Sequence, residues 1–324
     1  MAFLPLAGLS RESAEDMAEE IASAVQPVEN GEEGSEGGNE TEDNDSKAQD
    51  SFVILDTGSG EKLTVDDKSF CIGALACEMP PVYHEEALKA QCIACYTHFC
   101  RLREMQRSDP DPELGGAYFK ADLSKGREYL REELLREKWG DRYEEYRSKL
   151  AGVVDAVFGL IIKDREGKPA DIAYYAISSG VTEDSEDIFG FESDYLKAVP
   201  SPWDLNAPGY CSEKKVDRGE FNELLKKEDG SYSAEKGIGD IKRTASGSVL
   251  SIVIGGVEYK GARIRELFGL RSAVFTINEA DDSVIITVKG YGHGAGMSQY
   301  GANAMAEQGA DYKEIIYHYY RANL

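Results

Sequence analysis

Small and apolar residues dominate two adjacent segments of the chain and predict a packed pair of helices. The first segment ends at Glu78, because two prolines follow at once and proline cannot continue the hydrogen bonding of a helix. A second helix of about 24 residues is predicted to start near His84, with two glutamates in its first turn at the positive end of the helix dipole. The residues that carry this pattern are Ile72, Ala74, Leu75, Ala76 and Cys77 in the first helix and Ala87, Ala90, Ala94 and Cys95 in the second.

The pattern changes along the rest of the chain from helical spacing to short runs of β-branched residues. One hairpin is predicted over residues 52–65, about Gly58-Ser59-Gly60, and another over residues 159–177. The expected fold class is therefore α+β, with a helical first half that contains the helix pair and a β-rich second half. Further helices are predicted at residues 10–25, 127–139, 142–154, 221–227, 262–268, 298–308 and 312–320, and strands at residues 249–254, 257–260, 274–277 and 284–288.

Composition and charge limit the partners that the chain can have. The 324 residues carry 36 basic against 60 acidic side chains, a net charge of −24, and 41% of them are hydrophobic. Such a chain buries a sizeable core, and its negative surface repels phosphates, so we expect no nucleic-acid partner. Residues 29–50 hold nine acids, four glycines and one lysine, which is typical of a disordered linker. We expect a stub and acidic linker over residues 1–50 and a single folded domain over residues 51–324.

The start of the chain leaves export open. No segment reaches the roughly 20 apolar residues that cross a bilayer. Residues 1–9 are apolar but lack the basic region of a signal peptide, so two interpretations stand. Either residues 1–9 are the end of a membrane anchor whose upstream part is missing from this chain, or they are an ordinary amphipathic start.

The six cysteines admit three roles. Cys92 and Cys95 have the spacing C-x-x-C, but they lie within a predicted helix and no second such pair accompanies them. Core packing is the favoured role, and a metal or redox site and disulfide bonds are the alternatives. The cysteines lie at positions 71, 77, 92, 95, 100 and 211.

Glu78 is the candidate for acid–base chemistry. A glutamate at the end of a helix is in general solvated, which is the simpler interpretation. Here the neighbours Ala76, Cys77, Met79 and Pro80 are apolar, and a partly desolvated carboxyl has the raised pKa that a general acid requires. A hydrolytic glycosidase needs two carboxyl groups, whereas a lytic transglycosylase needs one, because the 6-hydroxyl of the sugar replaces water.

A glycine-rich turn follows the last predicted strand. It reads Gly290-Tyr-Gly-His-Gly-Ala-Gly296, which does not fit the G-x-G-x-x-G pattern of dinucleotide-binding proteins. His293 lies between glycines, so either a role in the site or a structural hydrogen bond within the turn explains it. The polar loop at residues 178–187 has two interpretations as well, an acidic turn or a rim that contacts hydroxyl groups of a sugar.

These motifs resemble a known family. E-M-P at Glu78, E-A-L-K-A-Q through Lys89, and G-Y-G-H-G-A-G-M-S-Q-Y-G-A from Gly290 are similar to stage II sporulation protein D, a family of peptidoglycan lytic transglycosylases that includes the amidase enhancers. The resemblance, from about residue 50 to the end, implies Glu78 as catalytic acid and base and a glycan-binding cleft between the two halves. It implies an extracytoplasmic, membrane-anchored enzyme that needs no cofactor. The substrate-binding residues that we expect are Lys89, Tyr96, Ser178, Thr182, His293 and Gln299.

The resemblance also implies a biological setting. The expected substrate is peptidoglycan glycan strands stripped of stem peptides, and the expected partners are stage II sporulation proteins P and M during engulfment. The alternatives are a non-catalytic wall-binding module that enhances an amidase and a cytoplasmic acidic protein.

Two positions and one segment depart from the family pattern. Tyr96 stands where the family has an arginine, and a phenol cannot replace the charge of a guanidinium. Ser179 replaces a glycine in the family's S-G-G-x-T-E loop. Clostridial members often hold zinc through a Cys and His cluster after the long helix, but residues 121–128 lack such ligands, so we expect no metal.

Overall fold

The computed structural model describes residues 50–324, and the helix predicted at residues 10–25, the acidic linker and the apolar start lie outside this part of the chain. The predicted helix pair is confirmed. Asp66 caps the first helix by accepting a hydrogen bond from the Ser69 N–H, and the helix ends at Glu78, before an extended Met79. His84 caps the second helix through the Glu86 N–H. These helices are α2 (Asp67–Glu78) and α3 (Glu85–Ser108).

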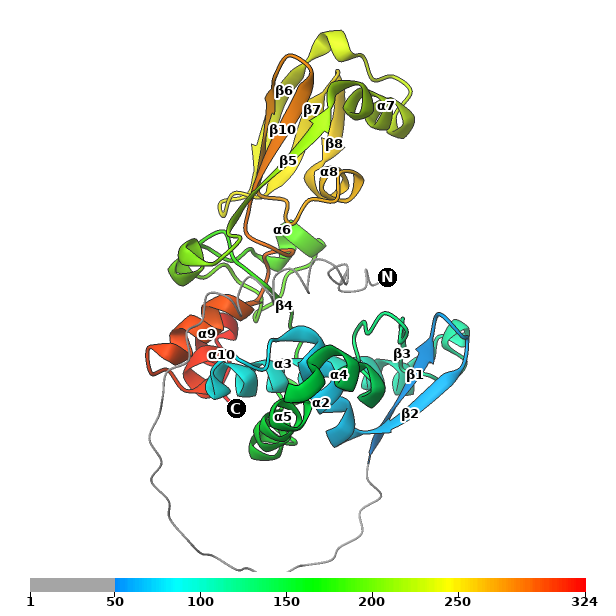
Figure 1. Ribbon diagram of the computed structural model, residues 1–324, viewed down its shortest axis with the longest axis vertical. Helices are drawn as coiled ribbons and strands as arrows, with labels where there is room; N and C mark the ends of the chain where they lie inside the picture. The colour runs from blue at the N-terminus through cyan, green and yellow to red at the C-terminus, as the bar shows by residue number, and fades with distance from the viewer. Residues whose placement is uncertain (1–49) are drawn as a thin grey trace, which may run out of the picture.

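A helical body surrounds this pair (Figure 1). Its main core joins α2 and α3 to α5, to residues 170–177 and to the two helices that end the chain. The short strand β4 pairs in parallel with β11, so the segment after the Gly290 turn is fixed beside residues 174–175. The further elements of this body are α4 (Glu132–Trp139), α5 (Tyr143–Val157), β4 (Tyr174–Tyr175), α6 (Ser185–Phe189), β11 (Met297–Ser298), α9 (Gln299–Glu307) and α10 (Tyr312–Tyr320).

A small sheet lies at the edge of the helical body. Its first two strands form the predicted hairpin, in which Phe52 lies opposite Val65, and the third strand adds in parallel. Phe52 and Phe70 are fully buried and join this sheet to α2 and α3 through a cluster of aromatic rings. The strands are β1 (Ser51–Asp56), β2 (Lys62–Asp66) and β3 (Phe119–Ala121).

A β-rich lobe with its own core spans residues 211–289. It holds two three-stranded antiparallel sheets, of order β5-β10-β9 and β6-β7-β8, and lies above the helical body in Figure 1. Its elements are β5 (Cys211–Asp217), α7 (Arg218–Glu228), β6 (Ile238–Arg243), β7 (Val249–Ile254), β8 (Val257–Lys260), α8 (Gly261–Leu267), β9 (Phe275–Glu279) and β10 (Ser283–Lys289). Short 3₁₀ turns occur at Pro112–Leu114, Gly140–Arg142, Pro202–Asn206 and Ala234–Lys236.

The α+β class is confirmed, but the expected division into a helical first and a β-rich second half is too simple. The chain leaves the helical body for the lobe and returns, since α9 and α10 pack on α3. The hairpin predicted over residues 159–177 is reduced to one bridge between Lys163 and Pro169, because residues 174–175 pair with β11 instead. Strands β5 and β6 were not predicted, since their exposed polar residues hide the β pattern.

The helix predicted over residues 127–139 begins five residues late. Residues 127–131 form a loop against α2, and Glu128 has a positive φ of 63°, which is incompatible with a right-handed helix. Of the cysteines, four are buried thiols, at positions 71, 92, 95 and 100, in agreement with the core role, while Cys77 is half-buried and Cys211 exposed. Among the helices of residues 50–324, none has the length and apolar character that a membrane span requires.

Candidate active site

Glu78 lies at the last position of α2, where the chain turns away from the helix. Met79 is buried, and the Glu78 side chain is half-buried. Its Oε2 lies 3.5 Å from the Nε2 of Gln299, the first residue of α9. The structure thus brings together two of the predicted site residues, from motifs 221 positions apart.

The surroundings of Glu78 raise the proton affinity of its carboxyl group. Burial raises the pKa of Glu78 to about 7, and the neighbouring carboxylate of Glu128 raises it further, while the hydrogen bond from Gln299 and the charge of Lys138 act in the opposite direction. At neutral pH the group is therefore present in both protonation states. This is the property that a residue needs to give up a proton and later take one back.

A buried chain of side chains orients the Gln299 amide. Gln91 lies on α3 and is fully buried, and its Nε2 donates to Cys95 Sγ at 3.2 Å. Cys95 Sγ in turn lies 3.2 Å from the Tyr174 hydroxyl. The Gln91 Oε1 therefore remains free to accept, and it lies 3.5 Å from Gln299 Nε2, so the amino group of Gln299 faces both Gln91 and Glu78. Gln91 was not among the predicted site residues, although it ends the E-A-L-K-A-Q motif.

Lys89 is engaged by a neighbouring carboxylate. Its Nζ lies 2.7 Å from Glu86 Oε1, and this hydrogen bond raises the pKa of Lys89. The other oxygen of Glu86 accepts from the backbone N–H of Tyr312 at 2.9 Å. Lys89 therefore lies where α3 meets the start of α10, and the structure gives it no hydrogen bond to Glu78.

Tyr96 lies at the opposite end of α2 from Glu78. Its hydroxyl donates to Asp67 Oδ2 at 2.7 Å, and Arg103 binds both oxygens of Asp67 at 2.8 and 3.0 Å. Asp67 is the first residue of α2 and Glu78 the last, so about 16 Å of helix separates them. Where the family pattern has an arginine, this chain thus has a phenol, and Arg103 supplies a guanidinium two turns later.

Ser178 and Thr182 are fully buried and shape the polar loop. The Ser178 N–H donates to Asp204 Oδ1 at 2.9 Å, and its hydroxyl accepts from the Gly180 N–H at 3.1 Å. Thr182 Oγ1 accepts from the Val199 N–H at 2.8 Å. Their hydroxyl groups are used within the protein, so any effect on a ligand acts through the conformation of the loop.

Asp204 is a further residue that sequence reasoning missed. It is fully buried and accepts from Ser201 and Ser298 as well as from the backbone of Ser178. Ser298 directly precedes Gln299, so this carboxylate ties the polar loop to the start of α9. Its sequence signal was weak, because a lone aspartate after Trp203 has no spacing that marks it.

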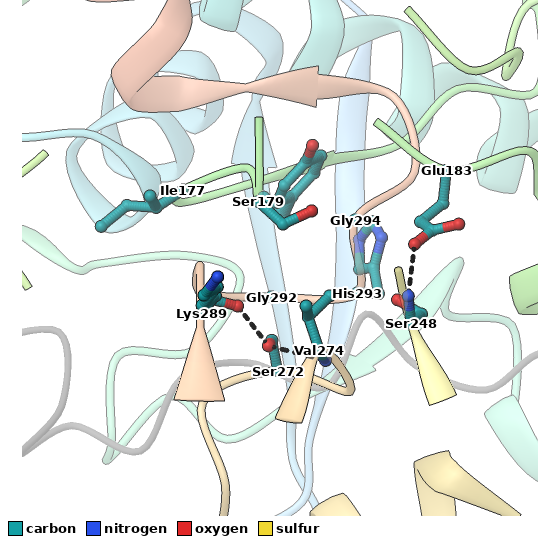
Figure 2. A pocket seen from close by; sticks show the side chains of 11 residues that line it. Ile177, Ser179, Glu183, Ser248, Ser272, Val274, Lys289, Gly292, His293 and Gly294 are labelled. Atoms are coloured by element: carbon teal, nitrogen blue, oxygen red, sulfur yellow. Dashed lines mark hydrogen bonds between the residues drawn. The ribbon is translucent and has the colours of Figure 1, made fainter. Parts of the chain in front are cut away.

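His293 lines a small cavity beside the turn (Figure 2). Its Nδ1 accepts from the Ala295 N–H at 3.2 Å, and burial lowers its pKa to about 4, so the ring is neutral at physiological pH. Glu183 lines the same cavity and accepts from Thr244 at 3.0 Å and from the Ser248 N–H at 3.2 Å. Glu78 is not among the residues that line this cavity. The hydrogen bond of His293 to Ala295 lies within the turn, and a role of His293 in the site stays a prediction.

Comparison with known proteins identifies the family. A scan against protein-family models finds no match. The stage II sporulation protein D of Bacillus amyloliquefaciens is 36% identical over 255 residues, which cover 78% of this chain and 72% of that protein. The stage II sporulation protein D of Bacillus subtilis is 34% identical over 272 residues, 84% of this chain and 77% of that protein.

The chain belongs to the stage II sporulation protein D family. A more distant relative is the amidase enhancer of Bacillus subtilis, which is 26% identical over 285 residues, 76% of this chain and 39% of that protein. The family resemblance rested on two motif regions, one around Glu78 and one around Gln299. In this stage II sporulation protein D family member, these two residues meet at one point of the helical body.

Proposed function

We propose that the protein is a lytic transglycosylase that cleaves peptidoglycan glycan strands, denuded of stem peptides, to 1,6-anhydro ends. Membership of the stage II sporulation protein D family supports a role in sporulation and the cell wall. The observation that carries the proposal is the Glu78 carboxyl, half-buried, with a pKa raised to about 7 and a hydrogen-bond donor from Gln299 at 3.5 Å. A carboxyl poised near neutral pH serves as both acid and base.

In this mechanism one carboxyl group performs two proton transfers. Protonated Glu78 gives its proton to the glycosidic oxygen while the bond from that oxygen to C1 of the sugar breaks. The resulting carboxylate, stabilised by the Gln299 amide, takes the proton of the sugar's 6-hydroxyl as O6 bonds to C1. Glu78 is then protonated again, and a 1,6-anhydro ring ends the strand.

We place the glycan strand in a cleft that joins Glu78 and Gln299 to the Gly290 turn and the polar loop at residues 178–187. His293 belongs to the turn, and Ser178 and Thr182 hold the loop in shape from within. Contacts of Lys89 and Tyr96 with substrate remain predictions. Both side chains are already bonded, to Glu86 and Asp67, so a structural role competes with substrate binding.

We further propose an extracytoplasmic, membrane-anchored protein that acts in septal wall remodelling and engulfment together with stage II sporulation proteins P and M. The substrate supports this location, because peptidoglycan lies outside the cytoplasmic membrane. Protease protection of intact sporulating cells tests it. If the protein is degraded only after lysis, the proposed location is wrong.

The activity is tested by incubating the protein with denuded glycan strands and detecting 1,6-anhydro-muramic ends by mass spectrometry. Wild type should form them, and Glu78→Gln should lose at least about 100-fold in rate, the lower range of a general acid's contribution. The amide keeps the shape of the protonated acid. Glu133→Gln, which removes an exposed carboxylate from α4, is the matched control and should retain full activity. Product from Glu78→Gln at the wild-type rate would remove Glu78 from its role.

A second candidate function is a non-catalytic wall-binding module that enhances an amidase. The similarity to an amidase enhancer and the phenol at position 96 favour it. Its distinguishing result is binding of denuded strands without anhydro product, together with faster stem-peptide release by an added amidase. The position of Tyr96, at the far end of α2 from Glu78, weakens the argument from that residue.

A further inference from the structure

Helix α9 contacts both ends of the loop between α2 and α3. This loop follows Glu78 directly and ends at His84, the N-cap of α3. At its first end, Gln299 Nε2 lies 3.5 Å from Glu78 Oε2. At its second end, Asn303 Oδ1 accepts from the His84 N–H at 2.8 Å. Gln299 and Asn303 lie on the same face of α9, because positions i and i+4 of a helix are one turn apart.

Asn303 supplies a contact that the start of α3 lacks in its own sequence. In a capping box, the residue three positions after the N-cap is Glu or Gln, and its side chain accepts from the N-cap N–H. In α3 this position is Ala87, whose methyl group accepts no hydrogen bond. The Asn303 amide accepts from this N–H instead, so α9 is attached to the first turn of α3.

The orientation of the Asn303 amide is fixed within α9. Asn303 is buried, and its Nδ2 donates to Glu307 Oε1 at 2.8 Å, one turn further along the helix. Because the amino group is engaged by this carboxylate, the amide oxygen faces the His84 N–H. The attachment of α9 to α3 therefore depends on one side chain in one orientation.

This bond is shorter than the two contacts that Gln299 makes. Gln299 Nε2 lies 3.5 Å from Glu78 and 3.5 Å from Gln91, at the outer limit of a hydrogen bond. Contacts of this length orient the amide but contribute little to holding the helix. At 2.8 Å, the bond between Asn303 and His84 is of ordinary strength, so it fixes α9 relative to the end of α2.

We propose that Asn303 is a positioning residue for the reaction of Glu78, which holds α9 through the His84 N–H so that the Gln299 amide meets the carboxyl group. This inference rests on the proposed function, because it takes Glu78 as the acid and base. In the second proton transfer the Gln299 amide stabilises the new carboxylate, and a displaced α9 would withdraw this donor. Asn303 itself forms and breaks no bond.

The first test follows the side-chain amide of Gln299 by NMR, in substrate-free protein labelled with ¹⁵N at its glutamine amides. The spectrum of Gln299→Leu assigns the signal. In the wild type this signal should shift as Glu78, whose pKa is about 7, loses its proton, and Glu78→Gln should abolish the shift. In Asn303→Ala most of the shift should be lost, because the amide no longer faces the carboxyl group.

Kinetics with denuded glycan strands separate positioning from structural support. Asn303→Ala should lower kcat for anhydro product by about 10- to 100-fold, the effect of a small misplacement in an active site. The KM should change little, since Asn303 is buried. In the Gln299→Leu background the same substitution should lower kcat no further, because the amide that it positions is absent. Additive losses in the double variant would overturn the inference.

Two further variants serve as controls. Asn303→Asp combined with Glu307→Gln exchanges the two side-chain types, so the net charge and both hydrogen bonds are kept. This variant should retain the wild-type amide shift and kcat, and a loss as large as that of Asn303→Ala would count against the proposal. Asn222→Ala removes a side-chain hydrogen bond to Tyr232 within the β-rich lobe and should change neither quantity.

Asn303→Leu keeps the inference falsifiable if the alanine variant folds poorly. Leucine branches at Cγ as asparagine does and fills the buried position, but it accepts no hydrogen bond from His84. A wild-type titration of the Gln299 amide in the folded alanine or leucine variant overturns the inference. The absence of anhydro product from the wild type refutes the proposed function instead, and the titration, which needs no substrate, distinguishes the two failures.

Discussion

Replacing the catalytic candidate should stabilise the protein at high pH. A carboxyl whose pKa is raised from 4.5 in the unfolded chain to about 7 in the folded protein ionises more easily when unfolded. The contribution of Glu78 to the stability of the wild type is therefore fully present below pH 4.5 and is lost as the pH rises through 7. Glu78→Gln removes this penalty, because a neutral amide replaces the titrating group and keeps its size.

The size of the effect follows from these two pKa values. Ionisation of Glu78 lowers the free energy of unfolding of the wild type by about 0.8 kcal/mol at pH 5 and by about 3 kcal/mol at pH 8. Because the half-buried side chain keeps some contact with water, the measured figure should fall at or below these values. Glu78→Gln should accordingly gain about 2 kcal/mol more at pH 8 than at pH 5.

Urea denaturation of both proteins at the two pH values measures the difference. Other groups with raised pKa values, such as Asp204 at about 6, titrate equally in both proteins and cancel in the comparison. Glu133→Gln, with an exposed carboxyl, should show no pH-dependent gain. The reasoning is refuted if Glu78→Gln is no more stable relative to wild type at pH 8 than at pH 5, since Glu78 would then be an ordinary solvated glutamate.

Three further substitutions test the site. Tyr96→Phe should cost about 1 kcal/mol of stability in urea denaturation, through the lost hydrogen bond to Asp67, and should leave glycan cleavage intact. A loss of cleavage without a loss of stability would assign the phenol to the substrate. Arg103→Leu should cost about 3–5 kcal/mol in the same measurement, because it leaves a buried carboxylate without its cation, and a smaller cost than Tyr96→Phe would contradict this. Gln299→Leu removes a donor to the carboxylate, so ¹³C NMR should show a rise in the pKa of Glu78, and a fall would exclude the hydrogen bond.

The local structure around Glu78 was predictable because it depends on local chemistry. Prolines at positions 80 and 81 end α2, and a polar residue at position 84 caps α3, so the residues themselves set these boundaries. The later strands β7 and β8 were predicted at their observed limits for the same reason, since a glycine pair at positions 255–256 separates two β-branched runs. Strand β5 was missed, because its pairing with β10 and not its polar sequence makes it a strand.

The sequence alone determined the α+β class, the helix pair, the family resemblance and the choice of Glu78. Only the tertiary structure decided which side chains surround Glu78. Gln91, Gln299 and Glu128 come from three separate segments, and contacts between distant segments leave no periodic signal in a single chain. The structure also places Tyr96 at the end of α2 that lies far from the Glu78 carboxyl. The length of α2 separates its two ends, and the packing of the helices decides which side chain contacts each end.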